Sequence, residues 1–173
     1  KLYYENKFAT RKAKLYESNG EVWHRTGDVG YFDDQGRIWF CGRKAHMCNS
    51  GDETYYSVKV EYCFSGLAGI NRVALVNISL NGQKVLALCI EPTQRFMSPT
   101  ARRTIVTDIV QVARRYRIPL RVIAFHARQF PVDKRHHAKI ERHLLAKWVQ
   151  DSLTRLRCNW AIYHVSMTNI AAR

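Results

Sequence analysis

Short blocks of apolar and polar residues alternate between residues 23 and 44, in the segment WHRTGDVGYFDDQGRIWFCGRK. Two runs of aromatic and branched residues, which are typical of β-strands, flank an Asp-Asp-Gln-Gly turn signal at 33–36. The pattern predicts a β-hairpin with polar groups at both ends. If the strands pair, Asp28 and Arg43 meet at the open end, where a carboxylate and a guanidinium could hold a ribose diol and its phosphate. From the spacing alone, an ordinary hairpin with a surface ion pair is the simpler interpretation.

Strands and helices are predicted in mixed order further downstream. Two apolar runs, at 72–79 and 83–91, surround Asn81-Gly82, which is the strongest short hairpin signal. A helix is predicted from Ser98, because a proline follows in the first turn and apolar residues then recur at helical spacing. Shorter signals add a helix at 58–66, a strand at 120–125 and a helix from Ile140 onward. The elements together predict the α+β fold class, with helices packed on a three-stranded sheet.

Three segments give weaker predictions. Residues 1–20 are polar and are expected to form a helical or irregular lead-in. Residues 45–54, AHMCNSGDET, are polar with one glycine, which predicts a loop between two domains. Residues 154–173 could form a strand or a disordered tail, and their sequence carries no functional interpretation.

Composition narrows the class of protein. The chain has 173 residues, of which 46% are hydrophobic, which is enough for a core. No run approaches the roughly 18 apolar residues of a transmembrane helix, and no signal-peptide pattern opens the chain. The five cysteines are odd in number and lack CxxC spacing, so we expect reduced, mostly buried thiols in a cytoplasmic protein. Because the chain begins at Lys1 without an initiator methionine, we expect a fragment of a longer protein.

The net charge of +14 is concentrated in the second half of the chain. Residues 102–147 hold twelve lysines and arginines against three acidic residues. Such an excess suits phosphate-rich partners, including nucleic acid, CoA and the phosphopantetheine arm of a carrier protein. A solvated basic face explains it equally well. Nucleic acid alone is the weaker interpretation, because no recognised binding motif accompanies the charge and aromatic residues do not interleave with the arginines.

Two motifs carry a resemblance to a known superfamily. Residues 25–28, RTGD, are followed by the predicted hairpin and then by GRK at 42–44. Far downstream, FPVD at 130–133 leads through RHHA to Lys139-Ile140. In this order the motifs resemble those of the AMP-forming adenylate synthetases, which include acyl-CoA ligases, luciferase and peptide synthetase adenylation domains. The segments GRKAH, TxY and FPVDxRHxAKI resemble the β-lactone synthetases of bacterial olefin biosynthesis, and the match covers roughly residues 1–150.

The resemblance implies a domain organisation. Residues 1–44 would be the distal end of a large adenylate-forming domain and would carry its ribose-binding motif. Residues 45–150 would be a small mobile C-terminal domain with the catalytic lysine, and residues 151–173 a tail of unknown role. The superfamily's phosphate loop, its Mg²⁺-binding glutamate and its acyl pocket would lie upstream, so the fragment is expected to be inactive alone.

The resemblance also assigns roles to the first motif. Asp28 matches the aspartate that binds both ribose hydroxyls of ATP, and Arg43 the arginine that supports the same ribose. Thr26 and Gly27 complete the nucleotide-binding motif, the glycine by close backbone approach or by turn geometry alone. Lys44 falls at the hinge, where one backbone torsion change swings the small domain between two catalytic poses.

Lys139 matches the catalytic lysine that bridges the attacking carboxylate and the α-phosphate, where it stabilises charge as pyrophosphate leaves. The chain departs from the wider superfamily at three places. It lacks the Lys-x-x-Gly pattern after the hinge, it has Ala138 where most members have glycine, and its loop from Pro131 is longer than usual. The last two departures agree with the β-lactone branch, whereas the first puts the usual CoA-ligase contacts of that loop in question.

The expected protein is therefore an ATP-dependent, AMP-forming acid ligase that uses ATP and Mg²⁺ through its upstream large domain. The favoured reaction makes a β-lactone from a long-chain 3-hydroxy acid. An acyl-CoA or acyl-carrier-protein ligase, or a peptide synthetase-like adenylation enzyme, is the alternative, and CoA would then be a substrate. Pathway enzymes or a carrier protein are possible partners. A non-catalytic basic module that binds proteins or nucleic acid is the alternative from another class.

The histidines at 136, 137 and 143 do not predict a metal site. His137 and His143 are six residues apart, and no cysteine or glutamate completes a compact ligand set. Contact of His136 or His137 with a substrate phosphate has no support in the sequence.

Overall fold

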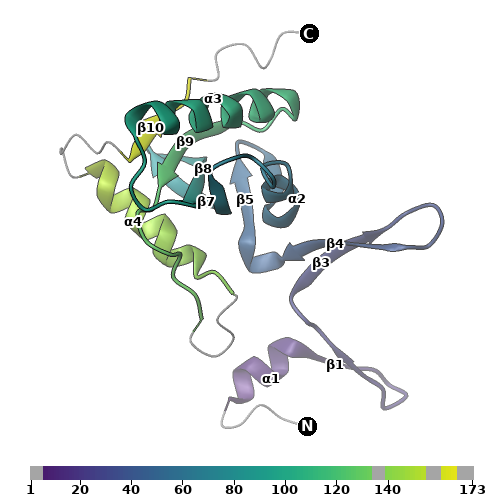
Figure 1. The fold of residues 1–173 in the computed structure, drawn as a ribbon. Coiled ribbons are helices and arrows are strands. Elements are labelled where there is room, and N and C mark those ends of the chain that lie inside the picture. The colour runs from purple at the N-terminus through teal and green to yellow at the C-terminus, as the bar shows by residue number, and fades with distance from the viewer. Residues whose placement is uncertain (1–5, 134–138, 155–160, 167–173) are drawn as a thin grey trace. The chain divides into compact units, whose positions relative to one another are not determined.

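The computed structural model describes residues 6–133, 139–154 and 161–166, and the chain divides into two units, Lys1–Ala45 and His46–Arg173. Helix α1 (Lys7–Ala13) opens the first unit, where the Asn6 side chain accepts a hydrogen bond of 2.8 Å from the Ala9 amide. Two separate antiparallel ribbons follow (Figure 1). They consist of β1 (Lys14–Tyr16) with β2 (Val22–His24), and of β3 (Asp28–Phe32) with β4 (Ile38–Arg43). The expected lead-in at 1–20 thus contains a helix and a strand.

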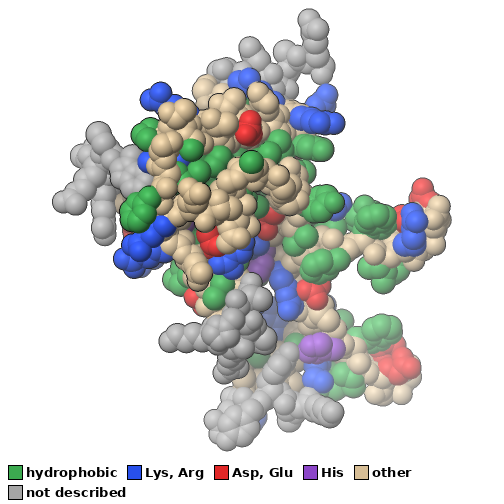
Figure 2. Space-filling model, in the orientation of Figure 1, with side chains coloured by type: hydrophobic (Ala, Val, Ile, Leu, Met, Phe, Trp, Pro, Cys, Tyr) green, Lys and Arg blue, Asp and Glu red, His purple; other side chains and the backbone are tan. Residues whose placement is uncertain are grey.

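The β3–β4 ribbon is the hairpin that the sequence predicts. Its register pairs Asp28 with Arg43 and Phe32 with Ile38, with a bulge between Val29 and Gly30. Among the described residues, both faces of the ribbon are open near its turn. Phe32 and its partner Ile38 are 70% and 72% exposed on one face, and Tyr31 and Trp39 are 45% and 48% exposed on the other. Figure 2 shows the resulting apolar surface on this part of the chain.

The second unit is built on a four-stranded sheet in the order β10-β9-β8-β7. The long strands β7 (Ile70–Leu80) and β8 (Gln83–Pro92) form an antiparallel hairpin. Asn81 and Gly82 both have positive φ at its turn, as a two-residue hairpin loop requires. Helix α3 (Pro99–Arg115) then crosses over to β9 (Leu120–Phe125), which runs parallel to β8. Helix α4 (Arg142–Thr154) and strand β10 (Ile162–His164) complete the unit.

Alternate residues of the sheet build two cores, one on each face. Leu86, Leu88 and Ile90 of β8 pack with α2 (Ser57–Tyr62) and α3, whereas Val85, Ala87 and Cys89 pack with α4. The period of two residues in a strand causes this division, because successive side chains point to opposite faces. The sheet is therefore covered on both faces, which explains why its central strands are apolar throughout.

The α+β fold class is confirmed, and the predicted strands at 72–79, 83–91 and 120–125 all form. The sheet has a fourth strand, because Ile162–His164 adds to the edge of β9. The helix predicted from Ile140 begins two residues later, at Arg142. Within the described ranges, no helix is long and apolar enough to span a membrane.

The loop predicted at 45–54 is wrong. A short 3₁₀ helix at Lys44–His46 leads into a further hairpin, β5 (Met47–Ser50) with β6 (Glu53–Tyr56), and Gly51 adopts positive φ at its turn. The Asn77 side chain of β7 holds this hairpin in place, since its Oδ1 accepts from the Asn49 amide and its Nδ2 donates to the Asn49 carbonyl oxygen, both at 2.8 Å. The polarity that suggested a loop belongs to side chains that are mostly exposed on the hairpin.

Candidate functional site

The open end of the β3–β4 hairpin collects the residues of the first motif. Asp28 and Arg43 lie opposite each other, with Arg43 Nε 3.2 Å from Asp28 Oδ1. Arg43 also donates from Nη1 to the Thr26 carbonyl oxygen at 2.6 Å. The Asp28 amide in turn donates to the Thr26 hydroxyl at 3.2 Å. The pairing predicted from the sequence therefore forms, and it extends to Thr26.

Backbone geometry closes the same end of the hairpin. The Lys44 amide donates to the Gly27 carbonyl oxygen at 2.9 Å, and Gly27 has a φ of +79°. An added Cβ at Gly27 would lie no nearer than 3.9 Å to Arg43 Nη1, so its backbone conformation, and not crowding, favours glycine there. Lys44 thus shares a hydrogen bond with the motif that precedes the hairpin.

This arrangement can accept hydroxyl groups and neighbouring negative charge. The Asp28 side chain is 37% exposed and that of Arg43 47%, so solvent reaches both charged groups. An ionised carboxylate accepts hydrogen bonds from two hydroxyls, and a fixed guanidinium favours a phosphate nearby. Because Thr26 holds one nitrogen of Arg43, the guanidinium is oriented before any ligand binds.

Asp33 organises the opposite end of the hairpin, a role that the sequence analysis did not assign. Its carboxylate accepts from the Trp39 indole at 2.8 Å, from Arg37 Nε at 2.7 Å and from the Arg37 and Gln35 amides. The indole hydrogen bond is the main cause that lowers the pKa of Asp33 to about 2. The turn signal marked this aspartate as a turn residue, but its partner Trp39 lies six positions away and gave no local cue.

Lys139 lies in the second unit, at the neck of the loop that joins β9 to α4. Val132 and Ile140 form an isolated antiparallel bridge. The Asp133 amide donates to the Lys139 carbonyl at 2.9 Å, and the Glu141 amide donates to the Pro131 carbonyl at 2.8 Å. The Lys139 side chain is exposed, while its backbone is paired across the neck. His136, His137 and Ala138 lie outside the described residues.

Glu91 lies under the first end of this loop and is only 3% exposed. Its carboxylate accepts hydrogen bonds from the Phe130 amide and Asn71, and from Arg72 at 2.6 and 3.1 Å. Burial opposes ionisation, but these donors outweigh it and lower the pKa of Glu91 below its usual 4.5. In the sequence, Glu91 is distinguished only as the end of a predicted strand. The sequence offered one signal for a special role of Glu91, which is that this acidic residue directly follows a run of apolar residues.

Glu61 and Arg142 form a second ion pair, partly buried, at the other end of the loop. Arg142 donates a hydrogen bond from each of its two terminal nitrogens to the Glu61 carboxylate, with Nη2 at 2.9 Å from Oε2. Glu61 also accepts the Leu75 amide of β7 at 2.6 Å. Burial raises the pKa of Glu61, whereas Arg142 and the Leu75 amide act against that rise. The two partners are 81 positions apart, so no local pattern could have paired them.

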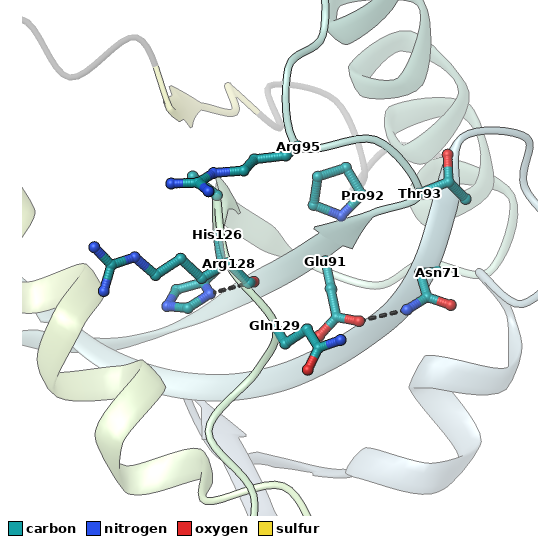
Figure 3. Close-up of a pocket in the computed structure, with 9 residues that line it drawn as sticks. Asn71, Glu91, Pro92, Thr93, Arg95, His126, Arg128 and Gln129 are labelled. Atoms are coloured by element: carbon teal, nitrogen blue, oxygen red, sulfur yellow. Dashed lines mark hydrogen bonds between the residues drawn. The ribbon is translucent and has the colours of Figure 1, made fainter.

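An open pocket of about 590 Å³ adjoins the base of the loop at the ends of β8 and β9 (Figure 3). Its lining includes Asn71, Glu91, Arg95, His126, Arg128 and Gln129. The close-up shows the Glu91 carboxylate turned toward Asn71, with Gln129 of the loop base beside it. The pocket and the first end of the Lys139 loop therefore share one wall.

Comparisons with known proteins agree on one group of enzymes. The chain is 38% identical over 156 residues to an olefin β-lactone synthetase of Stenotrophomonas maltophilia, and 39% identical over 151 residues to that of Xanthomonas campestris. These matches cover 87% and 84% of this chain. They cover only 28% and 27% of the relatives, so the chain spans somewhat more than a quarter of their length.

Ligases that form CoA thioesters are also similar. A long-chain fatty-acid–CoA ligase of Mycobacterium tuberculosis is 30% identical over 123 residues, which cover 71% of this chain and 23% of the relative. Among solved structures, an anthranilate CoA ligase in complex with anthranoyl-AMP matches with a TM-score of 0.71 at 19% identity. That match covers 88% of this chain and 28% of the ligase, and it supports the fold alone. No family model matches the chain.

Proposed function

The chain belongs to the AMP-forming adenylate synthetase superfamily, and from that premise we propose that it is part of an enzyme that makes a β-lactone from a 3-hydroxy acid. The observation that carries the proposal is the open end of the β3–β4 hairpin, where Asp28, Arg43 and Thr26 are joined by hydrogen bonds. The similarity to two olefin β-lactone synthetases over most of the chain supports the choice of product.

In the first half-reaction, a carboxylate oxygen of the acid attacks the α-phosphorus of ATP. A new oxygen–phosphorus bond forms, and the bond to the leaving pyrophosphate breaks. Asp28 and Arg43 hold the ribose, and the exposed Lys139 amine meets the negative charge that develops at the α-phosphate. A preorganised donor of this kind typically contributes about 10²–10³ in rate.

In the second half-reaction, the substrate's own 3-hydroxyl attacks the acyl carbonyl and loses its proton. The four-membered ring closes and the bond to AMP breaks, so no thiol is consumed. Intramolecular attack avoids the entropic cost of recruiting a second substrate, and the mixed anhydride supplies a good leaving group. A site closed to water protects the adenylate from hydrolysis.

Mg²⁺ would accompany the phosphates of ATP and neutralise part of their charge. Among the described residues, no three His, Cys, Asp or Glu side chains come together to hold a metal ion. The resemblance to the superfamily implies that its Mg²⁺-binding glutamate lies upstream of these residues, and no step of the reaction is assigned to a metal. On the same resemblance, residues 1–44 and 45–150 are proposed as the end of the large domain and the small mobile domain, with Lys44 at the hinge.

The test uses the purified full-length enzyme with ATP, Mg²⁺ and a long-chain 3-hydroxy acid, with and without CoA. Products are identified by mass spectrometry and NMR. The matched control is the acid of the same length without its hydroxyl, which should release pyrophosphate but form no lactone. Lactone and AMP without CoA would support the proposal. Acyl-CoA as the sole product, with AMP release that depends on CoA, would instead identify an acyl-CoA ligase, the activity named for the similar mycobacterial protein.

A further inference from the structure

The segment that carries Lys139 is held at both of its ends by a carboxylate with little exposure, since the Glu91 side chain is 4% exposed and that of Glu61 15%. At its first end, Glu91 accepts the backbone amide of Phe130, the residue before Pro131. At its second end, Glu61 holds Arg142, which is three positions after Lys139 and opens helix α4. Between the two ends, the bridge from Val132 to Ile140 keeps the two sides of the neck together.

Each carboxylate is itself fixed by several donors. Glu91 binds Arg72 and Asn71 in addition to the Phe130 amide, so both of its oxygens are engaged. The Arg72 guanidinium also lies 5.7 Å from the centre of the Phe130 ring, which adds a second contact to the same loop residue. Glu61 receives the Leu75 amide, and Arg142 lies 3.4 Å from the Leu75 carbonyl oxygen, so this pair is attached to the backbone of β7.

Stability alone does not explain two such pairs. The side chains of Glu61 and Arg142 are each 15% exposed, and that of Glu91 is 4% exposed beside Arg72 at 33%, so the two carboxylates lose most of their hydration. Replacing a buried ion pair by apolar side chains of similar volume is often neutral or stabilising. An ion pair of fixed geometry orients the segments that carry its two side chains, since a bidentate arginine and a carboxylate orient each other.

We propose that Glu91 and Glu61 are positioning residues, which fix the two sides of the neck, 131–133 and 139–141, and thereby set where the Lys139 amine meets the α-phosphate. The inference rests on the proposed function, because it gives Lys139 that role. Glu91 acts through the Phe130 backbone amide, and Glu61 acts through the Arg142 side chain. A displacement of about 1 Å at a reacting group can cost roughly 10²-fold in rate, so loosening one end should be measurable.

The experiment compares Glu91→Gln and Glu61→Gln with Glu141→Gln in the full-length enzyme. Each change removes one negative charge and keeps the shape of the side chain. Glu141 is the matched control, because it lies in the same neck but contributes its backbone amide, which the substitution leaves in place. Acid-dependent pyrophosphate release gives kcat and the KM for ATP. We expect kcat to fall about 10- to 100-fold in Glu91→Gln and Glu61→Gln, with KM within about twofold, and the control to remain near the parent.

A double-mutant cycle separates positioning from a general loss of structure. In a Lys139→Ala background, Glu91→Gln and Glu61→Gln should lower the residual rate by less than about threefold, because the group that they position is gone. Equal losses with and without Lys139 would overturn the inference. A Lys139→Ala enzyme of normal rate would overturn the proposed role of Lys139 instead, so the two failures are distinguishable.

Hydrogen exchange provides a readout that does not need activity. The amides of Asp133 and Glu141 donate across the neck, so their exchange should accelerate in Glu91→Gln and Glu61→Gln. Amides in the centre of β8 should keep the parent rate, which shows that the sheet is folded. Arg142→Lys is the second variant for the Glu61 end, because it keeps the charge but loses the bidentate fork. Unchanged exchange at both neck amides in all these variants would refute the inference.

Discussion

The two units of the chain differ in how they bury their apolar residues. In Lys1–Ala45, the large side chains of both ribbons are mostly exposed, among them Trp23 at 60% and Phe40 at 57%. In His46–Arg173, the central strands β8 and β9 are almost wholly buried between helices on both faces. A two-stranded ribbon is marginal in water without something to pack against, whereas a covered four-stranded sheet supplies its own core. The second unit therefore specifies its own structure, and the first is expected to rely on further covering surface.

The largest expected effect tests that difference directly. Leu88→Ala removes a side chain with no exposure in the centre of β8, and we expect it to lower the free energy of unfolding by about 2–5 kcal/mol. Phe40→Ala in the exposed ribbon of this chain should change it by less than about 0.5 kcal/mol. Urea denaturation followed by circular dichroism gives both values. Equal losses at the two positions would contradict the contrast between the units.

Substitutions at functional residues should follow the same division between the units, and a substitution in the second unit should lower the reaction rate. Lys139→Ala in the full-length enzyme should lower the rate of adenylation by about 10²-fold or more, about 2.7–4 kcal/mol, while ATP still binds. The measurement is acid-dependent pyrophosphate exchange, with ATP binding determined separately by calorimetry. Lys147→Ala, an exposed lysine of α4, is the control. Normal exchange in Lys139→Ala would remove this residue from the mechanism.

Binding effects should come from the first unit. Asp28→Ala removes the acceptor for the ribose hydroxyls and leaves Arg43 without its carboxylate partner. We expect ATP affinity to fall roughly 10- to 100-fold, since hydrogen bonds to charged groups contribute about 1.5–3 kcal/mol. Calorimetry on the full-length enzyme measures this, with Asp34→Ala in the hairpin turn as a control of the same charge. If both variants bind ATP equally well, Asp28 is not the ribose ligand.

The smallest expected effect concerns the pH dependence of the hairpin turn. The pKa of Asp33 is about 2 in the folded chain against an ordinary 3.8, so the folded state binds its proton more weakly than the unfolded state. Its stabilising contribution is therefore complete above about pH 4 and is lost as the pH falls toward 2. NMR titration of the Asp33 carboxyl carbon should give a midpoint near 2, and Trp39→Phe should raise it. A midpoint at the ordinary value in the parent chain would contradict the indole hydrogen bond.

Local signals predicted much of this fold, and distant pairings account for what they missed. Asn81-Gly82 and the turn at 33–36 identify two hairpins, because turn chemistry is encoded in adjacent residues. Strand β10 has three residues and forms by adding to the edge of β9, so its own short pattern left a strand and a tail both open. The β5–β6 hairpin was missed because its side chains are polar and mostly exposed, and because the Asn77 side chain that holds the Asn49 backbone lies 28 positions away.

The residues of the candidate site also fall into those that local signals could predict and those that depend on distant pairings. Asp28 and Arg43 could be paired from the hairpin register, and the superfamily motifs drew attention to Lys139. The two carboxylates at the ends of its loop could not be found, because Glu91 meets Phe130 across 39 positions and Glu61 meets Arg142 across 81. Such partners become neighbours only when the sheet and both of its covering layers are in place.

Strand β7 forms one edge of the sheet, and an edge strand with free amides invites pairing with another molecule. Side chains occupy two of these amides here, since Leu75 donates to Glu61 at 2.6 Å and Ser79 donates to Gln150 at 2.8 Å. Along a strand, the amides of alternate residues point to the same side. Residues 75 and 79 are four positions apart, so both amides point to the same side, away from β8. The side chains that link the helices to this edge thus also limit self-association of the chain. Gln150→Ala, which leaves the Lys139 loop untouched, should free one amide and raise the apparent mass in light scattering at high concentration.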